Sequence, residues 1–234
     1  EDECRELVER HGPGFWFRRT GKHLLSLSTG PKILWLQRHA PEVWGRLGKL
    51  CMVEDWLVWR LCGRCASGVS NTAFTDLSDT PGRRWDPELL GILGLRAQQL
   101  CEVVEAGECV GRLTPAAAAH LGLSEEVIVA SGAHDQSAAA VGAGATRPGD
   151  VLLSCGTAWT LFCVLRQTLV DPQERLWISC HSYPDQWSFI LPFNGGVVYD
   201  WFREHFGAGE SAPEQPDAPP LLFMPFLYGA LSPH

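Results

Sequence analysis

Asp135 is the strongest candidate for chemistry in the chain, because it stands between a short apolar run and a row of small residues. Val127 to Ala130 predicts a strand, and Ser137 to Ala143 predicts a closely packed helix. Unpaired N–H groups and the helix dipole at such a junction favour an ionised carboxylate. We therefore expect Asp135 to accept a proton at neutral pH.

A second polar turn follows the predicted helix, at Ser154, Cys155, Gly156 and Thr157. A glycine lets backbone N–H groups approach an anion, and a threonine hydroxyl adds a donor. A carboxylate base followed by a phosphate-binding turn indicates phosphoryl transfer. Taken alone, however, the aspartate is more often a helix cap.

Both sites belong to a longer pattern, Gly132-Ala133-His134-Asp135-Gln136, then Gly142-Ala143-Gly144, then Gly156-Thr157. Further segments agree with it in order: Lys32 to His39, Glu54 to Gly63, Pro225 to Gly229, and Pro233 with His234. Together they resemble the FGGY carbohydrate kinases, the family of xylulokinase, glycerol kinase and gluconokinase. The likeness covers nearly the whole chain.

The resemblance implies an α/β protein with the ribonuclease H-like (actin-like ATPase) fold, in which ATP and a sugar bind in a cleft between two domains that close. It implies a kinase that uses ATP and Mg²⁺ to phosphorylate a ketopentose or polyol hydroxyl. Asp135 is the implied general base, with a contact to Mg²⁺. Asp135, Gln136 and His134 are the implied substrate-binding residues, His134 as a packed or sugar-lining side chain.

The resemblance also implies that Gly156 and Thr157 receive the phosphates of ATP. Gly195 and Gly196, after Asn194, are candidates for the nucleotide side, although a helix cap accounts for them equally well. Gly142-Ala143-Gly144 is not a dinucleotide fingerprint, because it follows the predicted helix instead of opening it. We expect a close helix-to-strand contact there.

The resemblance divides the chain into residues 1–147, the C-terminal part of the first kinase domain, and residues 148–234, the N-terminal part of the second. The family's Asp-x-Gly-Thr, Trp-x-Asp-x-Arg and Gly-Gly-x-Ser segments do not occur in this sequence. We therefore expect a central piece of a kinase that is inactive alone. Gly68 also stands where the family carries an aspartate.

Two other functions stay open. The chain could derive from a kinase that became a non-catalytic sugar-binding or regulatory protein, which Ala230-Leu231 in place of the family's Glu-Arg favours mildly. It could also belong to another ATPase of the actin-like fold, against which Gln136 and the Lys32 to His39 segment argue.

The composition is that of a globular protein of one or two domains, with 234 residues and a net charge of −8. This acidity argues against nucleic acid or an anionic membrane as a partner. The longest apolar run, Leu221 to Leu231, is too short to cross a membrane. We expect a cytoplasmic protein with a small-molecule sugar substrate, and a homodimer stays open.

Nine cysteines are an odd number for a disulfide framework, and most lie in apolar segments. We therefore expect buried free thiols. Cys62 and Cys65 form a Cys-x-x-Cys pair, but no second pair follows at zinc spacing, so the sequence disfavours a metal site. The ten tryptophans also lie mostly in apolar segments, which predicts core positions for the majority.

Periodicity and capping residues predict these helices: Glu3 to His11, Pro31 to His39, Glu54 to Cys62, Asp86 to Leu93, Ala116 to Leu121 and Gly196 to Phe206. The Glu54 to Cys62 helix is apolar nearly all round, so we expect it to be buried. The predicted strands are Leu50 to Val53, Val151 to Ser154, Trp159 to Leu165, Trp177 to His181 and Trp187 to Pro192. Gly207 to Pro220 is a predicted linker.

Overall fold

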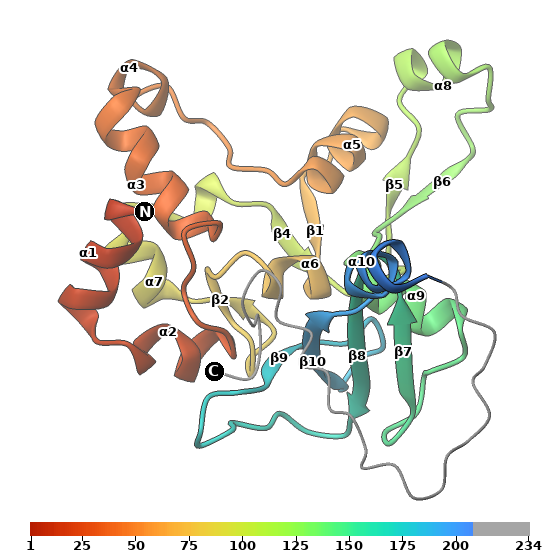
Figure 1. Ribbon diagram of the computed structural model, residues 1–234. Helices are drawn as coiled ribbons and strands as arrows, with labels where there is room; N and C mark the ends of the chain where they lie inside the picture. The colour runs from red at the N-terminus through yellow and green to blue at the C-terminus, as the bar shows by residue number, and fades with distance from the viewer. Residues whose placement is uncertain (208–234) are drawn as a thin grey trace, which may run out of the picture.

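The computed structural model describes residues 1–207 (Figure 1). The predicted linker after Gly207, the apolar run Leu221 to Leu231 and the motif Pro225 to Gly229 lie outside the described residues. The described part is a mixed α/β structure with a helical N-terminal half and a four-stranded sheet near its C-terminal end.

The helices of residues 1–207 are, in chain order, α1 (Asp2–His11), α2 (Gly14–Thr20), α3 (Thr29–His39), α4 (Pro41–Trp44), α5 (Val53–Cys62), α6 (Val69–Ala73), α7 (Pro87–Ile92), the 3-10 turn η1 (Ala97–Gln99), α8 (Pro115–Leu121), α9 (Asp135–Gly142) and α10 (Gly196–Phe206). The observed helix α10 has the same bounds as the helix predicted from the sequence, Gly196 to Phe206. Thr114 caps α8 as expected, because its side chain accepts from the Ala117 N–H.

The strands are β1 (Ala66–Gly68), β2 (Ser78–Asp79), β3 (Arg84–Trp85), β4 (Glu102–Val104), β5 (Cys109–Arg112), β6 (Ile128–Ala130), β7 (Val151–Cys155), β8 (Ala158–Leu165), β9 (Trp177–Cys180) and β10 (Trp187–Asn194). The main sheet has the antiparallel order β7-β8-β10-β9, which confirms the four strands predicted there. Three two-stranded sheets pair β1 with β4, β2 with β3, and β5 with β6.

The core is divided among several clusters. One joins α1, α2, α3 and α7, seen at the left of Figure 1, through side chains such as Leu7, Trp16 and Leu89. Another places Ala140 of α9 against Phe162 and Ile190 of the main sheet. The small residues of α9 therefore let the helix approach the sheet closely, as the sequence predicted.

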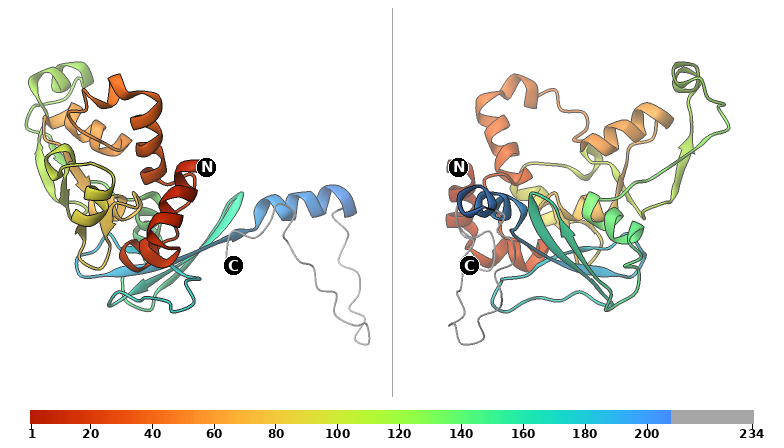
Figure 2. Two further views of the ribbon diagram at one scale, coloured as in Figure 1. Left: turned by 90° about the vertical axis from the view of Figure 1, so that its left-hand side faces the viewer. Right: turned by 45° about the vertical axis from the view of Figure 1, so that its right-hand side comes forward.

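Hydrogen bonds tie the main sheet to the N-terminal half. The backbone N–H of Ile178 in β9 donates to Gly21 O at 2.9 Å. The Trp187 indole of β10 donates to Thr80 O at 3.1 Å. Figure 2 shows the sheet lying along the base of the helical half, with α10 projecting beyond its end.

The helix α5 corrects the expectation of a buried helix. Asp55 and Val58 are its buried residues, whereas Val53, Trp56, Leu57 and Trp59 are all exposed. The predicted strand Leu50 to Val53 is also wrong, because the segment makes only an isolated bridge from Leu50 to Leu100 before α5 begins. The apolar composition of α5 suggested a core helix, but only a narrow face of the helix packs against the rest of the protein.

The tryptophans meet the expectation of core positions in half of the cases. Trp16 is buried, and four partly buried ones pack against the core clusters: Trp44, Trp85, Trp177 and Trp187. Trp35, Trp56 and Trp59 are instead between 47% and 49% exposed. Among the described residues, no helix is long and apolar enough to span a membrane.

Candidate active site

The acid segment, which we define as residues 131–137, connects β6 to α9 and carries Asp135. Asp135 is the first residue of α9, and its side chain is 82% exposed. Its Oδ1 accepts a hydrogen bond from the backbone N–H of Gln136 at 2.6 Å. The strand, turn and helix therefore lie as predicted, and they present this carboxylate to solvent.

His134 packs directly behind the carboxylate. Its ring stacks on Phe74, with centroids 3.6 Å apart and planes inclined by 6°. Its Nδ1 lies 3.1 Å from Asp135 Oδ1, without hydrogen-bond geometry. Burial lowers the pKa of His134, the Asp135 carboxylate opposes this shift, and Lys22 adds to it. The imidazole is therefore a neutral, packed neighbour of Asp135 at neutral pH.

A buried lysine lies on the same aromatic side chain. Lys22 Nζ is 5.0 Å from the Phe74 ring centroid and donates to the backbone oxygens of Thr20 and Ala73. Burial lowers the pKa of Lys22, and Asp76 opposes that effect. The lysine thus contributes to the field that disfavours a proton on His134.

Glu54 of α5 holds the start of the acid segment. Its Oε1 accepts from the Gly132 N–H at 3.1 Å. Burial raises the pKa of Glu54, Asp55 adds to the rise, and the Gly132 hydrogen bond opposes it. A Cβ at Gly68 would lie 2.4 Å from Gly132 O and 3.3 Å from Glu54 Oε1. The glycine that stands in place of the expected aspartate therefore leaves room for this contact.

Hydroxyl groups fix the rest of the acid segment. The His134 N–H donates to Ser70 Oγ at 3.0 Å. Ser137 Oγ lies 2.7 Å from Ser182 Oγ and accepts from the Ser182 N–H at 2.9 Å. The segment is thus bound on one side to α6 and on the other to the chain just after β9.

Gln136 is partly buried, and its Oε1 has no hydrogen-bond partner among residues 1–207. An amide oxygen that is buried without a donor is uncommon and costs free energy. Gln136 lies next to Asp135, where the resemblance places the sugar. A hydrogen bond from Gln136 to the sugar stays a prediction.

The glycine corner, which we define as Gly156, Thr157, Gly195 and Gly196, brings together the two predicted nucleotide segments. Gly156 and Thr157 form the exposed turn between β7 and β8, and Gly195 and Gly196 lead from β10 into α10. The Val197 N–H donates to Thr157 O at 3.0 Å. Two segments that are far apart in the sequence therefore share one end of the main sheet.

The glycines of this corner are required by close approach. A Cβ at Gly196 would lie 2.2 Å from Gly156 O, and one at Gly195 would lie 2.1 Å from the Trp159 ring. Gly195, the N-cap residue of α10, has no side chain to cap the helix, and the N–H groups of Val197, Val198 and Tyr199 already donate to Thr157 O and Gly195 O. The helix dipole beside an exposed turn still makes this a suitable place for a phosphate group.

The contact expected at Gly142-Ala143-Gly144 is absent. A Cβ at Gly142 or Gly144 would meet no atom within 4 Å. Gly144 instead has φ of 86°, in the left-handed region, where it turns the chain after α9. The interpretation as a packing contact was wrong, and backbone conformation explains Gly144.

The sequence did not indicate Glu54, Ser70, Phe74 or Lys22 as parts of the site. Gly132 lies 78 positions from Glu54, and His134 lies 64 positions from Ser70. No local pattern marks such pairs. Two signals were available: Glu54 begins a segment that resembles the family, and Gly68, which lies close to Gly132, departs from the family pattern.

Comparisons with known proteins agree with this architecture. Residues 1–142 match the FGGY family of carbohydrate kinases, N-terminal domain. The autoinducer-2 kinase of Yersinia pestis (strain Pestoides F) is 34% identical over 211 residues, which are 89% of this chain and 40% of that protein. The chain therefore spans less than half the length of this curated relative.

Solved structures show the same fold. A xyloylose kinase from Brucella ovis superposes with a TM-score of 0.89 at 29% identity, over 99% of this chain and 49% of that one. Xylulose kinase from Rhodospirillum rubrum gives 0.81 at 26% identity, over 87% and 41%. The predicted α/β, ribonuclease H-like (actin-like ATPase) fold is confirmed.

Proposed function

Because the chain belongs to the FGGY family of carbohydrate kinases, we propose that it supplies the proton-accepting and phosphate-facing parts of an ATP-dependent sugar kinase. The acceptor is a hydroxyl of a ketopentose or polyol. The observation that carries this proposal is Asp135, an exposed carboxylate at the start of α9 on a segment held from α5, α6 and the end of β9.

In this mechanism Asp135 accepts the proton of the attacking sugar hydroxyl. His134 stays neutral behind it, so that it does not form a permanent ion pair with the base. Gln136 orients the sugar through its amide. Glu54 and Ser70 keep the acid segment in place, which matters because a base must lie within hydrogen-bond reach of its proton.

The glycine corner holds the phosphates of the nucleotide in the proposal. The dipole at the N-terminus of α10 fits that group, and the Thr157 hydroxyl adds a donor. When bound, ATP would supply the phosphoryl group, and Mg²⁺ would neutralise the charge that develops during transfer. The exposed Asp135 carboxylate is the type of ligand that Mg²⁺ takes together with substrate phosphates.

The names of the relatives guide the choice of substrates. Autoinducer-2 and xylulose are the first acceptors to test, because relatives at 34% and 26% identity are kinases of these compounds. Glycerol-like polyols form a second group. The division into residues 1–147 and 148–234, the cytoplasmic location and a homodimer remain predictions.

Asp135→Asn, made in the full-length kinase that contains this chain, tests the proposed base. We expect turnover to fall by roughly 10², or about 2.7 kcal/mol of transition-state stabilisation, because the amide cannot accept the proton. The unfolding transition should not change, since the side chain is 82% exposed. The measurement is the steady-state rate of ADP formation with each acceptor, alongside thermal unfolding.

Glu125→Gln is the control, because it also neutralises an exposed acid but lies in the connection before β6. Its turnover should equal that of the unchanged protein. Equal turnover in Asp135→Asn and Glu125→Gln would refute the assignment of the base. Acceptor binding without any ADP formation by the full-length protein that contains this chain would favour the non-catalytic alternative, because the chain alone is expected to be inactive.

A further inference from the structure

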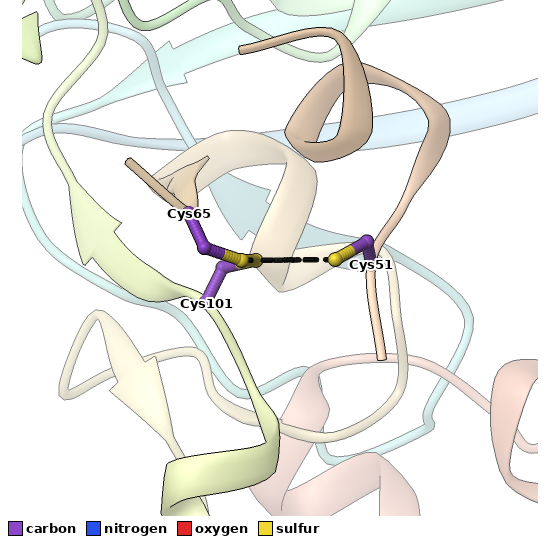
Figure 3. A group of neighbouring side chains, drawn as sticks. All are labelled: Cys51, Cys65 and Cys101. Atoms are coloured by element: carbon purple, nitrogen blue, oxygen red, sulfur yellow. Dashed lines mark hydrogen bonds between the residues drawn. A yellow bond between two sulfur atoms is a disulfide. The ribbon is translucent and has the colours of Figure 1, made fainter. Parts of the chain in front are cut away.

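Three cysteines from distant parts of the chain meet beside α5. Cys65 and Cys101 form a disulfide, and the Sγ atom of Cys51 lies 3.6 Å from each of their sulfurs (Figure 3). All three sulfurs lie within 4.8 Å of one another. The disulfide corrects the expectation that all the cysteines are free thiols. The two members of the Cys-x-x-Cys pair have different partners, because Cys65 is in the disulfide and Cys62 donates to Val58 O.

Backbone pairing places the three cysteines side by side. Ala66 pairs with Glu102 in the parallel strands β1 and β4, so the preceding residues, Cys65 and Cys101, are neighbours with Cα atoms 4.9 Å apart. Leu50 makes a parallel bridge to Leu100, which puts Cys51 next to Cys101. Backbone pairing between neighbouring segments therefore fixes the positions of the three cysteines.

The position of Cys51 distinguishes two kinds of thiol chemistry. A thiolate that breaks a disulfide attacks one sulfur along the S–S axis. Cys51 is equally far from both sulfurs, so it approaches the bond from the side. Three sulfurs around one point are instead the arrangement of a thiolate metal site, where Zn–S bonds of about 2.3 Å separate the sulfurs by roughly 3.8 Å.

We propose that Cys51, Cys65 and Cys101, once the disulfide is reduced, bind a thiophilic d¹⁰ metal ion such as Zn²⁺ through three thiolates. A dithiol reductant opens the Cys65–Cys101 bond: it gives two electrons and two protons and becomes a disulfide itself. The metal ion then displaces the thiol protons, three if all three cysteines are protonated, and forms three metal–sulfur bonds.

The surroundings suit this ion. Cys51 and Cys65 line a pocket of about 740 Å³ together with Trp56 and Trp59, which gives an entry path and space for a fourth ligand. Three thiolates and a divalent ion carry one net negative charge. Lys49 lies two residues before Cys51, and its Nζ donates to Leu100 O at 2.8 Å, beside Cys101, where its positive charge offsets that charge.

The test is a Cd²⁺ titration of the reduced protein, after the dithiol has been removed without oxygen. Cd²⁺ replaces Zn²⁺ because its bonds to thiolates give an ultraviolet charge-transfer band. We expect one ion per chain to bind, and Cys51→Ser to weaken this binding by roughly 100-fold. The oxidised protein should lack this binding.

Cys62→Ser is the matched control, since Cys62 shares the Cys-x-x-Cys pair but lies outside the cluster. It should bind as the unchanged protein does. Equal binding by Cys51→Ser and the unchanged protein would overturn the proposal, and so would equal losses in both variants.

Alkylation of the unchanged protein avoids any folding defect of a variant. Cd²⁺ should protect Cys51, Cys65 and Cys101 from iodoacetamide, and it should leave the exposed Cys109 and Cys155 reactive. Mass spectrometry that finds the three cluster cysteines modified equally with and without Cd²⁺ would also refute the site.

Discussion

The acid segment and the glycine corner reach their shapes by opposite means. In the acid segment, side chains from distant elements hold the backbone, as Glu54 holds Gly132 and Ser70 holds His134. In the glycine corner, the absence of side chains allows close contact: Gly196 lies against Gly156, and Gly195 lies against the Trp159 ring. A small change should therefore affect activity in the first region and stability in the second.

Gly196→Ala should give the largest effect. The added Cβ would lie 2.2 Å from the backbone oxygen of Gly156, which cannot move without distorting the turn. We expect a loss of about 3 kcal/mol in the free energy of unfolding, together with weaker nucleotide binding. Denaturant unfolding and nucleotide titration measure both. Normal stability would show that the turn is not fixed by this contact.

Glu54→Ala should act mainly on catalysis. It removes the acceptor of the Gly132 N–H, so the acid segment loses one of its supports. We expect kcat to fall roughly tenfold, with a stability change of about 1 kcal/mol. Glu54→Gln keeps the acceptor oxygen and should restore most of kcat. If both variants lose the same activity, the charge matters and the hydrogen bond does not.

The same glutamate gives a pH prediction. Burial raises the pKa of Glu54 in the folded protein above its ordinary value of 4.5. The folded state therefore binds the proton more tightly, and the stability that this adds is lost as the pH rises through the folded pKa. The stability of Glu54→Gln relative to the unchanged protein should therefore rise over this pH window. We expect this rise to be smaller than the stability change caused by Glu54→Ala.

Unfolding measured from pH 4 upward checks this sign, because Asp76 is present in both proteins and its effect largely cancels in the difference. Asp55 contributes to the difference through its interaction with Glu54. A constant difference across the window would contradict a buried, charged Glu54.

Gly142→Ala should give the smallest effect and the opposite sign. Nothing lies within 4 Å of an added Cβ there, and Gly142 is the last residue of α9. We expect a gain of about 0.5 kcal/mol, since alanine favours a helix more than glycine does. A loss comparable to that of Gly196→Ala would mean that the two glycines do not differ as their surroundings indicate.

Local signals in the sequence predicted much of the candidate site. The strand, turn and helix around Asp135, the turn at Gly156 and Thr157, and the start of α10 at Gly196 all lie where composition and capping placed them. These features depend on neighbours within a few positions, where helix and turn preferences act. Their roles in catalysis and nucleotide binding stay predictions.

Contacts between distant segments could not be predicted. Glu54 was assigned to a buried helix, yet α5 exposes Trp56 and Trp59 and turns Glu54 toward Gly132. The Cys65–Cys101 pair likewise depends on the parallel register of β1 and β4. Hydrophobic content does not reveal which face of a helix has a partner, because that depends on the assembled fold.

The bonds between the main sheet and the N-terminal half restrict how these two parts can move relative to one another. A rotation of the sheet about residues 143–150 would break the Gly21–Ile178 and Thr80–Trp187 bonds, at roughly 1 kcal/mol each. Slow amide exchange at Ile178 that persists when nucleotide is added would confirm this restriction, and faster exchange would contradict it. The sheet is thus held to the N-terminal half at its β9 edge, and we expect any larger movement at the end that carries α10.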